Sequence, residues 1–497
     1  MDLTPARALA TDLAAAPFTD AALKARCGDA AFAALTRADA VPARRMLERR
    51  GDDPVAVLAR LFVCGDAVPA ASVAAALSST GLEGAERAGV LVRDGETVRA
   101  ALAIRPHVFS DGADGWIVSD LDELAGVFPL RPDHVLGVGG AGRTLVAMLP
   151  ESGTGAALDL GCGCGLIAFE LRRRGFSVVA TDISERAAAF TRLGAELNGL
   201  DRIDVRVGDL FAPVHDERFA FIASNPPFVI TPRSADVPAY EYRDGGRAGD
   251  ALMADVVTSL RAHLESGGRA ALLGNWEDRD GLAGLDRVRS WTQGIGAWVI
   301  EREHLDPVRY AELWVRDGGM RPGTPAHDAL LTAWLDDFEA RGVTGIGMGW
   351  VQLTEGSALA RFERVAQAVD HGPLAAHLDA AWETDRVLAG LDDDALDAAV
   401  MQVAADVTEA RHHLPGAESP SVIELRQGGG LARVLEVDPA LAALVGASDG
   451  DLPVGVLIGA IAGLLEVDAD ALSDDLRPRV RELLFTGQLA IADGPRG

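Results

Sequence analysis

The chain has 497 residues, 48% of them hydrophobic and 24% charged, which is an ordinary composition for a globular protein with a large core. Its length predicts roughly two to four domains. The formal charge of −28 disfavours sequence-independent binding to nucleic acid, because such binding requires clustered lysine and arginine.

Residues 1–106 are expected to form a helical, winged-helix-like domain. Alanine-rich helices fill the first 50 residues, with a break expected at Val41-Pro42. Three further helices are then expected, followed by two strands around a turn, over residues 54–63, 69–77, 81–88, 90–92 and 98–104. The third helix of such a unit reads DNA. Here it carries Glu83 and Glu86 beside a single Arg87, which favours substrate recruitment or dimerisation over DNA binding.

A linking segment follows, with a strand expected at 116–120 and a glycine-rich turn at 133–145 that leads into a helix. The turn precedes the first strand of the next domain, a position from which it can cover a ligand. Close packing beneath a helix is the alternative interpretation.

The stretch around Gly161, Gly163 and Gly165 predicts a ligand-binding loop. An apolar strand at 156–160 precedes it, and a helix at 166–174 follows. Glycine has no Cβ, so the backbone turns tightly and approaches a ligand closely. Such a loop between a parallel strand and a helix N-terminus is typical of a nucleotide-like cofactor site, although a purely structural turn has the same spacing.

Three more strands end in polar residues. Strand 178–182 ends at Asp182, about twenty residues after the glycines, where a carboxylate binds ribose hydroxyls in dinucleotide sites. The strand at 205–207 leads to Asp209, and the strand at 219–224 leads to the tetrad Asn225, Pro226, Pro227 and Phe228. Strands and helices alternate up to residue 277, which predicts a Rossmann-like, doubly wound, mostly parallel α/β sheet.

This order resembles class I S-adenosylmethionine-dependent methyltransferases, and the tetrad resembles the group that methylates a planar nitrogen. The segment from Asp244 to Gly249 is also similar to the one that follows the tetrad in protein (release factor) glutamine methyltransferases. The resemblance covers roughly residues 135–275 and implies S-adenosyl-L-methionine as the cofactor, with Asp182 at the ribose and Asp209 at the adenine amino group. The cofactor-binding residues that we expect are Asp159, Gly161, Cys162, Gly163, Gly165, Asp182, Ile183, Asp209, Leu210 and Asn225.

The tetrad suits the chemistry of a delocalised nitrogen, which is a poor nucleophile. Two acceptors, the side-chain oxygen of Asn225 and the carbonyl of Pro226, can hold its N–H groups and aim its lone pair. The prolines stiffen this geometry, and Phe228 is expected on the flat face of the substrate group. The candidate catalytic residues are therefore Asn225, Pro226, Pro227 and Phe228. An ordinary turn at the end of a strand is the alternative.

Three residues are candidates for contacts with the substrate. Arg143 lies in the glycine-rich segment, where the release factor methyltransferases carry a different, proline-rich sequence. Tyr240 and Tyr242 follow the tetrad, and ordinary packing is the alternative for both. The methyltransferase domain is expected to span 107–356, with its last strands at 296–300 and 345–353.

Residues 357–497 are expected to form a second small helical, winged-helix-like domain. Acidic helices over 374–413 precede a hairpin over 423–437 and three helices, at 439–445, 454–465 and 476–484. The acidity of this region favours a protein partner or a lid over nucleic acid.

The four cysteines predict neither a disulfide framework nor a zinc site. Acids at Asp2 and Asp12 are untypical of a signal peptide, and no apolar segment is long enough to span a bilayer. We therefore expect a cytoplasmic protein with reduced thiols, no bound metal and no membrane partner.

Taken together, these patterns predict an N-methyltransferase between two accessory domains, with a glutamine or asparagine amide of a protein or peptide as the favoured substrate. An exocyclic amino group of an RNA or DNA base suits the tetrad equally and the charge less. A small-molecule tailoring enzyme and a non-catalytic, cofactor-binding regulator are further alternatives. The sequence predicts no oligomeric state.

Overall fold

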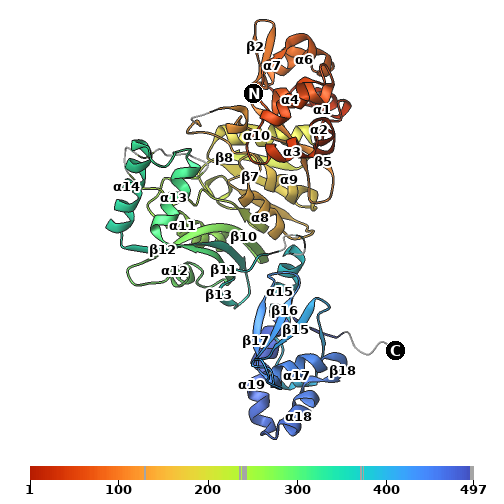
Figure 1. The fold of residues 1–497 in the computed structure, drawn as a ribbon, viewed down its shortest axis with the longest axis vertical. Helices are drawn as coiled ribbons and strands as arrows, with labels where there is room; N and C mark the ends of the chain where they lie inside the picture. The colour runs from red at the N-terminus through yellow and green to blue at the C-terminus, as the bar shows by residue number, and fades with distance from the viewer. Residues whose placement is uncertain (128–129, 234–236, 238–242, 370–371, 373, 493–497) are drawn as a thin grey trace. The chain divides into compact units, whose positions relative to one another are not determined.

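The computed structural model describes the whole chain except residues 128–129, 234–236, 238–242, 370–371, 373 and 493–497 (Figure 1). The chain divides into two compact units. One comprises residues 1–146 and 152–363, and the other comprises 147–151 and 364–497. The domain boundaries at 106 and 356 stay predictions.

An eight-stranded sheet forms the centre of the first unit, in the order β13-β11-β12-β10-β9-β6-β7-β8. Its strands are β6 (Ala156–Leu160), β7 (Ser177–Asp182), β8 (Ile203–Val207), β9 (Phe219–Ser224), β10 (Leu264–Arg279), β11 (Gly296–Leu305), β12 (Val343–Thr354) and β13 (Ala360–Arg364). Strands β6 to β10 pair in parallel, whereas β12 runs antiparallel to both of its neighbours. The predicted Rossmann-like, mostly parallel sheet is confirmed.

Strand order reverses beside β6, which sets the location of any ligand site. From β6 the chain builds outward through β7 to β8, and it then returns to place β9 and β10 on the other side of β6. The loops that leave β6 and β9 therefore diverge at the carboxyl ends of the strands, where doubly wound sheets bind ligands. The helices that connect these strands are α9 (Leu166–Arg173), α10 (Glu185–Leu197), α11 (Ala251–Leu260) and α12 (Gly284–Trp291).

The centre of the sheet is buried because β6, β9 and the middle of β10 are mostly apolar. Leu158, Ile222 and Leu272, on three adjacent strands, are fully buried in one core cluster together with residues of α11 and α12. Near-continuous apolar runs are typical of parallel strands that helices cover on both faces.

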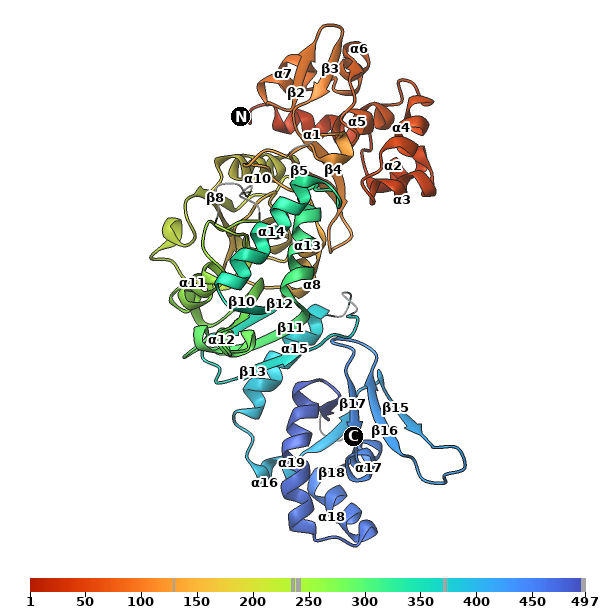
Figure 2. The same ribbon diagram turned by 60° about the vertical axis from the view of Figure 1, so that its left-hand side comes forward.

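Two helices inserted between β11 and β12, α13 (Pro307–Asp317) and α14 (Pro325–Ala340), lie side by side in Figure 2. They pack on the segment that follows the tetrad through a second cluster that includes Val229, Ile230 and Tyr310. The fully buried Tyr310 hydroxyl accepts hydrogen bonds from the backbone N–H of Ile230 (3.1 Å) and from the side-chain amide of Asn275 (2.7 Å). Tyr310 thus ties the exit of the tetrad to β10.

The N-terminal helices are α1 (Ala6–Ala15), α2 (Asp20–Cys27), α3 (Asp29–Leu35), α4 (Val41–Glu48), α5 (Pro54–Phe62), α6 (Ala70–Ala76) and α7 (Gly81–Arg87). The expected break at Val41-Pro42 is wrong, because these residues begin α4. Proline is tolerated in a first helical turn, where its missing N–H would have no helical partner.

An antiparallel sheet of order β1-β3-β2 completes this region, with β1 (Val68–Pro69), β2 (Leu91–Asp94) and β3 (Thr97–Ala100). The strand expected over 98–104 divides into β3 and β4 (Ala103–Val108), and β4 pairs with β5 (Asp114–Ser119). The assignment of this region as a winged helix stays a prediction.

The link to the sheet contains a 3-10 turn at Glu123–Ala125 and the helix α8 (Gly140–Met148). Two further 3-10 turns lie at Ala212–Val214 and Arg261–His263.

The second unit contains five helices and six strands among its described residues. They are α15 (Leu374–Leu388), α16 (Asp393–Ala398), β14 (Val400–Val403), β15 (Val407–His412), β16 (Val422–Gln427), β17 (Val434–Val437), α17 (Pro439–Ala447), β18 (Asp449–Pro453), α18 (Val454–Leu465), α19 (Ala469–Phe485) and β19 (Leu489–Ile491). The hairpin of β16 and β17 is confirmed. The expectation of helices throughout 374–413 is wrong, since β14 pairs with β18 and β19 while β15 pairs with β16. Backbone pairing with strands that are distant in sequence outweighs the local helical preference of these residues.

In the part of the chain that the structure describes, every helix is too short or too polar to cross a membrane.

We expect the substitution Tyr310→Phe to lower the free energy of unfolding by about 1–3 kcal/mol, because it leaves two buried donors without their acceptor. Urea unfolding followed by tryptophan fluorescence measures this change. The matched control is Glu312→Gln, a half-exposed position on the same helix, which should change stability by less than about 0.5 kcal/mol. Equal stabilities of Tyr310→Phe and the wild type would contradict the stabilising role of the hydrogen bonds that link the end of the tetrad to β10 through Tyr310.

Candidate functional site

A cavity of about 450 Å³ opens at the carboxyl ends of β6, β7 and β9. Its volume lies in the range of small-molecule and cofactor sites. Its wall is formed by residues 134–139, 141–142, 160–164, 166–167, 181–184, 187, 208–210, 224–227, 244–246 and 252. The glycine loop, the three strand ends and the tetrad, which are separated in sequence, therefore meet at one cavity.

The glycine loop presents bare backbone to this cavity. Gly161 and Gly163 have φ angles of 83° and 53°, which L side chains rarely adopt. A Cβ added at either residue would meet nothing within 4 Å, so both face open space. Gly165 differs, because a Cβ there would lie 2.6 Å from the ring of Phe169. Gly165 does not line the cavity and instead allows close packing against α9.

The buried Asp159 and the half-buried Asp182 hold the loop. The carboxylate of Asp182 accepts hydrogen bonds from the backbone N–H groups of Gly163 and Ser184, both at 2.9 Å. Burial raises the pKa of Asp182. Asp159 accepts one hydrogen bond from the N–H of Ala168 in the first turn of α9, and burial raises its pKa to about 7. Asp182 lines the cavity, whereas Asp159 lies behind the loop.

The other predicted cofactor residues lie along the same wall. Ile183 is 63% exposed, so its apolar surface is open to a ligand in the cavity. Asp209 is exposed, and Leu210 has a φ of 45°. Strained backbone of this kind concentrates at functional sites. All three residues line the cavity.

The tetrad closes the wall on the side of β9. Asn225, Pro226 and Pro227 line the cavity, and the buried Oδ1 of Asn225 has no hydrogen-bond partner among the described residues. Phe228 does not line the cavity. Its half-buried ring packs against both hydrophobic clusters, and its backbone forms an antiparallel bridge with Asp244.

The candidate substrate residues are not brought to this cavity. Arg143 is exposed and absent from the wall. Its charge acts on His107, whose pKa is lowered by burial, raised in part by Glu170 and lowered further by Arg143. Tyr240 and Tyr242 lie outside the described residues.

Several wall residues were not predicted individually. Residues 134–139 belong to the glycine-rich segment that was expected to cover a ligand. The glycine-rich pattern was therefore the sequence signal for this part of the wall. Asp244 was noted only as part of a motif. Thr181 and Ser184 carried no separate signal, because they flank Asp182. Among the described residues, no group of three or more His, Cys, Asp or Glu side chains is arranged to hold a metal ion.

Residues 124–276 match the family model of the methyltransferase small domain. This segment is a class I S-adenosylmethionine-dependent methyltransferase domain. The predicted resemblance, the methyltransferase class and its cofactor are confirmed at the level of this domain. Residues 15–101 match a domain of unknown function, DUF7059.

Curated relatives of two kinds match part of the chain. The chain is 31% identical over 139 residues to the release factor glutamine methyltransferase of Aquifex aeolicus, covering 26% of this chain and 49% of that protein. It is 35% identical over 143 residues to the corresponding protein of Yersinia pestis, with the same coverage. It is 29% identical over 175 residues to the ribosomal RNA small subunit methyltransferase C of Salmonella arizonae, covering 35% of this chain and 44% of that protein. The chain thus spans about half the length of the curated relatives it matches.

A solved methyltransferase structure from Pyrococcus furiosus covers 43% of this chain and 81% of its own, with 17% identity and a TM-score of 0.27. A likeness this weak supports no argument about the site.

The wall residues fit S-adenosylmethionine. The bare loop at Gly161 and Gly163 leaves room for its amino acid portion, and Asp182 and Asp209 offer acceptors for hydroxyl and amino donors. The orphaned oxygen of Asn225 is an acceptor that the protein itself leaves unused. The roles of these individual residues stay predictions.

We expect the wild type to lose stability relative to Asp159→Asn as the pH rises from 4 to 7. Over this range the folded carboxyl keeps a proton that the unfolded chain, with a pKa near 3.8, has released, so unfolding becomes easier as pH rises. Between pH 5 and pH 8 the difference is on the order of 3 kcal/mol, since stability falls over the two pH units below the folded pKa and one unit corresponds to about 1.4 kcal/mol. Urea unfolding of both proteins at pH 5 and pH 8 measures this difference. If the free energies of unfolding of the two proteins changed in parallel with pH, the prediction that Asp159 is buried and titrates would be contradicted.

Proposed function

We propose that the chain is an S-adenosylmethionine-dependent N-methyltransferase that acts on a glutamine or asparagine amide of a protein or peptide. The observation that carries the proposal is the buried, unpartnered Oδ1 of Asn225, which lies in the cavity wall beside Pro226. A buried acceptor without a partner costs free energy, so it indicates a missing donor. The N–H groups of a planar amide supply that donor.

In this proposal the bound cofactor supplies the methyl group. Asp182 accepts hydrogen bonds from its ribose hydroxyls, Asp209 accepts one from its adenine amino group, and Ile183 covers the base. Asn225 and the carbonyl of Pro226 orient the acceptor nitrogen. Holding a reacting nitrogen in one orientation accounts for several kcal/mol of barrier reduction.

The substrate assignment draws on the curated relatives. Those named release factor glutamine methyltransferase share 29–35% identity with this chain, which favours a protein amide. The relatives named ribosomal RNA small subunit methyltransferase C favour a second candidate, an exocyclic amino group of an RNA base. The formal charge of −28 weighs against the RNA candidate, because phosphate contacts require basic residues.

We further propose three domains with boundaries near 106 and 356. The terminal domains are winged-helix-like units that recruit a protein partner, and the protein acts in the cytoplasm. The acidic side chains on α7, Glu83 and Glu86, support a protein rather than DNA as that partner.

Asn225→Ala should reduce methyl transfer by at least about a hundredfold, the usual effect of removing one polar group that stabilises a transition state. The dissociation constant of S-adenosylhomocysteine, measured by calorimetry, should change less than about threefold, since many other contacts hold the cofactor. Unchanged turnover in this variant would contradict the role of the tetrad.

Incubation of the protein with radiolabelled S-adenosylmethionine and lysate of the host should label a macromolecule that protease degrades and nuclease does not. The Asn225→Ala protein serves as the background control. A label that nuclease removes would favour the RNA candidate, and a label on material that both treatments spare would favour a small-molecule substrate.

A further inference from the structure

Asp244 lies in the cavity wall directly beside the tetrad. Its backbone pairs with Phe228 in an antiparallel bridge, and the N–H of Val229 donates to the carbonyl of Arg243 at 2.9 Å. The Asp244 side chain is only 2% exposed. The two segments therefore hold Asn225 and Asp244 on adjoining parts of the same wall.

The two carboxylate oxygens of Asp244 have different surroundings. Oδ1 accepts a hydrogen bond from the backbone N–H of Gly246 at 2.9 Å and forms an ion pair with Arg233. Oδ2 is buried and has no hydrogen-bond partner among the described residues. A buried carboxylate oxygen in this state costs free energy, and a donor that enters the cavity would recover that cost.

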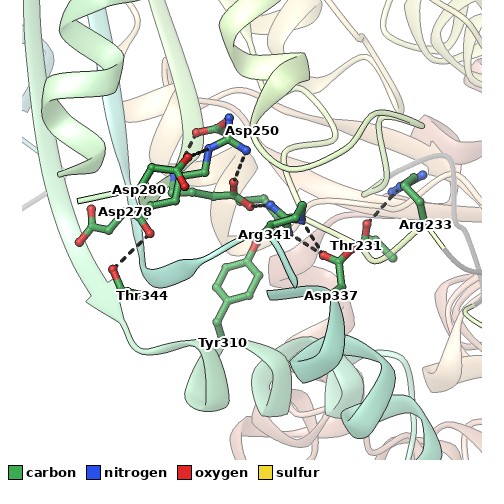
Figure 3. Close-up of polar contacts among 12 residues, drawn as sticks. Thr231, Arg233, Asp250, Asp278, Asp280, Tyr310, Asp337, Arg341 and Thr344 are labelled. Carbon is green, nitrogen blue, oxygen red and sulfur yellow. Dashed lines mark hydrogen bonds and ion pairs between the residues drawn. The ribbon is translucent and has the colours of Figure 1, made fainter. Parts of the chain in front are cut away.

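The loop that carries Asp244 is anchored at its far end, at Asp250 (Figure 3). Asp250 accepts hydrogen bonds from the N–H of Glu277 at 3.1 Å and from Arg287 at 2.7 and 3.0 Å. Glu277 in turn pairs with Arg341, which Asp337 also holds at 2.6 Å. These contacts fix the end of the loop to β10, α12 and α14, so the loop is restrained on both sides of Asp244.

We propose that Asp244 is a substrate-binding residue whose Oδ2 accepts a hydrogen bond from a main-chain N–H of the substrate peptide. The inference rests on the proposed function. A primary amide has two N–H groups, and Asn225 and Pro226 already provide two acceptors for them. A third acceptor implies a further donor on the substrate, and a glutamine within a peptide carries one in its own main-chain N–H.

The chemistry of this donor also separates a peptide from adenine and cytosine, but not from guanine. The ring atoms beside the amino groups of adenine and cytosine are acceptors, which a carboxylate repels, whereas guanine has a donor there. An unpaired carboxylate oxygen in a chain of charge −28 further disfavours a phosphate-bearing substrate.

The test uses Asp244→Asn, which keeps the shape of the side chain and one oxygen for Gly246 and Arg233 but replaces the free acceptor with a donor. The matched control is Asp317→Asn, which removes the same charge from a half-exposed side chain that pairs with the neighbouring Arg243 at 3.0 Å and does not line the cavity. Calorimetry with S-adenosylhomocysteine comes first. If the wild type fails to bind S-adenosylhomocysteine, both the proposed function and the inference are contradicted. If it binds, the inference is tested by the two substrate probes described next.

Two small probes are then titrated against the full chain with S-adenosylhomocysteine bound, using ligand-observed NMR. One is N-acetylglutamine dimethylamide, which has a single main-chain N–H, and the other is its ester analogue, with oxygen in place of that N–H. We expect Asp244→Asn to weaken the first probe about tenfold or more, as for a hydrogen bond to a charged group, and to leave the second unchanged. Asp317→Asn should leave both unchanged.

Four outcomes would overturn the inference. The first is that the amide probe binds the wild type and Asp244→Asn equally, and the second is that both probes weaken equally. The third is that the wild type binds neither probe. The fourth is that guanosine, titrated in the same way, binds the wild type and is weakened in Asp244→Asn. Equal weakening of both probes would indicate a structural role for Asp244, and the guanosine outcome would assign the site to nucleic acid.

Discussion

The reversal of strand order beside β6 is the constraint on which the site depends. It separates the loops that leave β6 and β9, so a cavity opens between them at the carboxyl edge of the sheet. Backbone hydrogen bonds then hold the glycine loop in place, since the N–H groups of Gly161 and Cys162 both donate to the carbonyl of Thr181, at 2.8 and 2.9 Å. The loop is therefore shaped by the neighbouring strand, and its bare face is left for a ligand.

Carboxylates provide much of the polar chemistry around this cavity. Asp159 and the half-buried Asp182 accept hydrogen bonds from backbone N–H groups, and the buried Asp244 accepts one from an N–H group and pairs with an arginine. These donors do not fully offset burial at Asp159 and Asp182, whose pKa values are raised. A wall rich in acceptors selects ligands with hydroxyl and N–H donors, which is consistent with a nucleoside portion at one end and an amino or amide group at the other.

The helices α13 and α14 support the cavity from outside the sheet, on the side of the tetrad. Tyr310 fixes the residue two positions beyond Phe228, and the Glu277–Arg341 ion pair fixes β10 to α14. The tetrad is thus held between the sheet on one side and this helical pair on the other. Positioning of this kind matters because a misplacement of about 1 Å can reduce catalysis a hundredfold.

Sequence alone determined the parallel sheet, the glycine loop and the polar ends of β7 and β9, because these depend on local patterns of apolar residues, glycine and strand-ending acids. It did not determine that Phe228 packs away from the cavity, that Asp159 lies behind the loop or that Arg143 is absent from the cavity wall. It also did not determine the strands β14 and β15, whose partners lie elsewhere in the chain. The unpartnered oxygens of Asn225 and Asp244 likewise emerged only from the folded chain. A partner or its absence is decided by residues far apart in sequence, and only the tertiary structure brings those residues together.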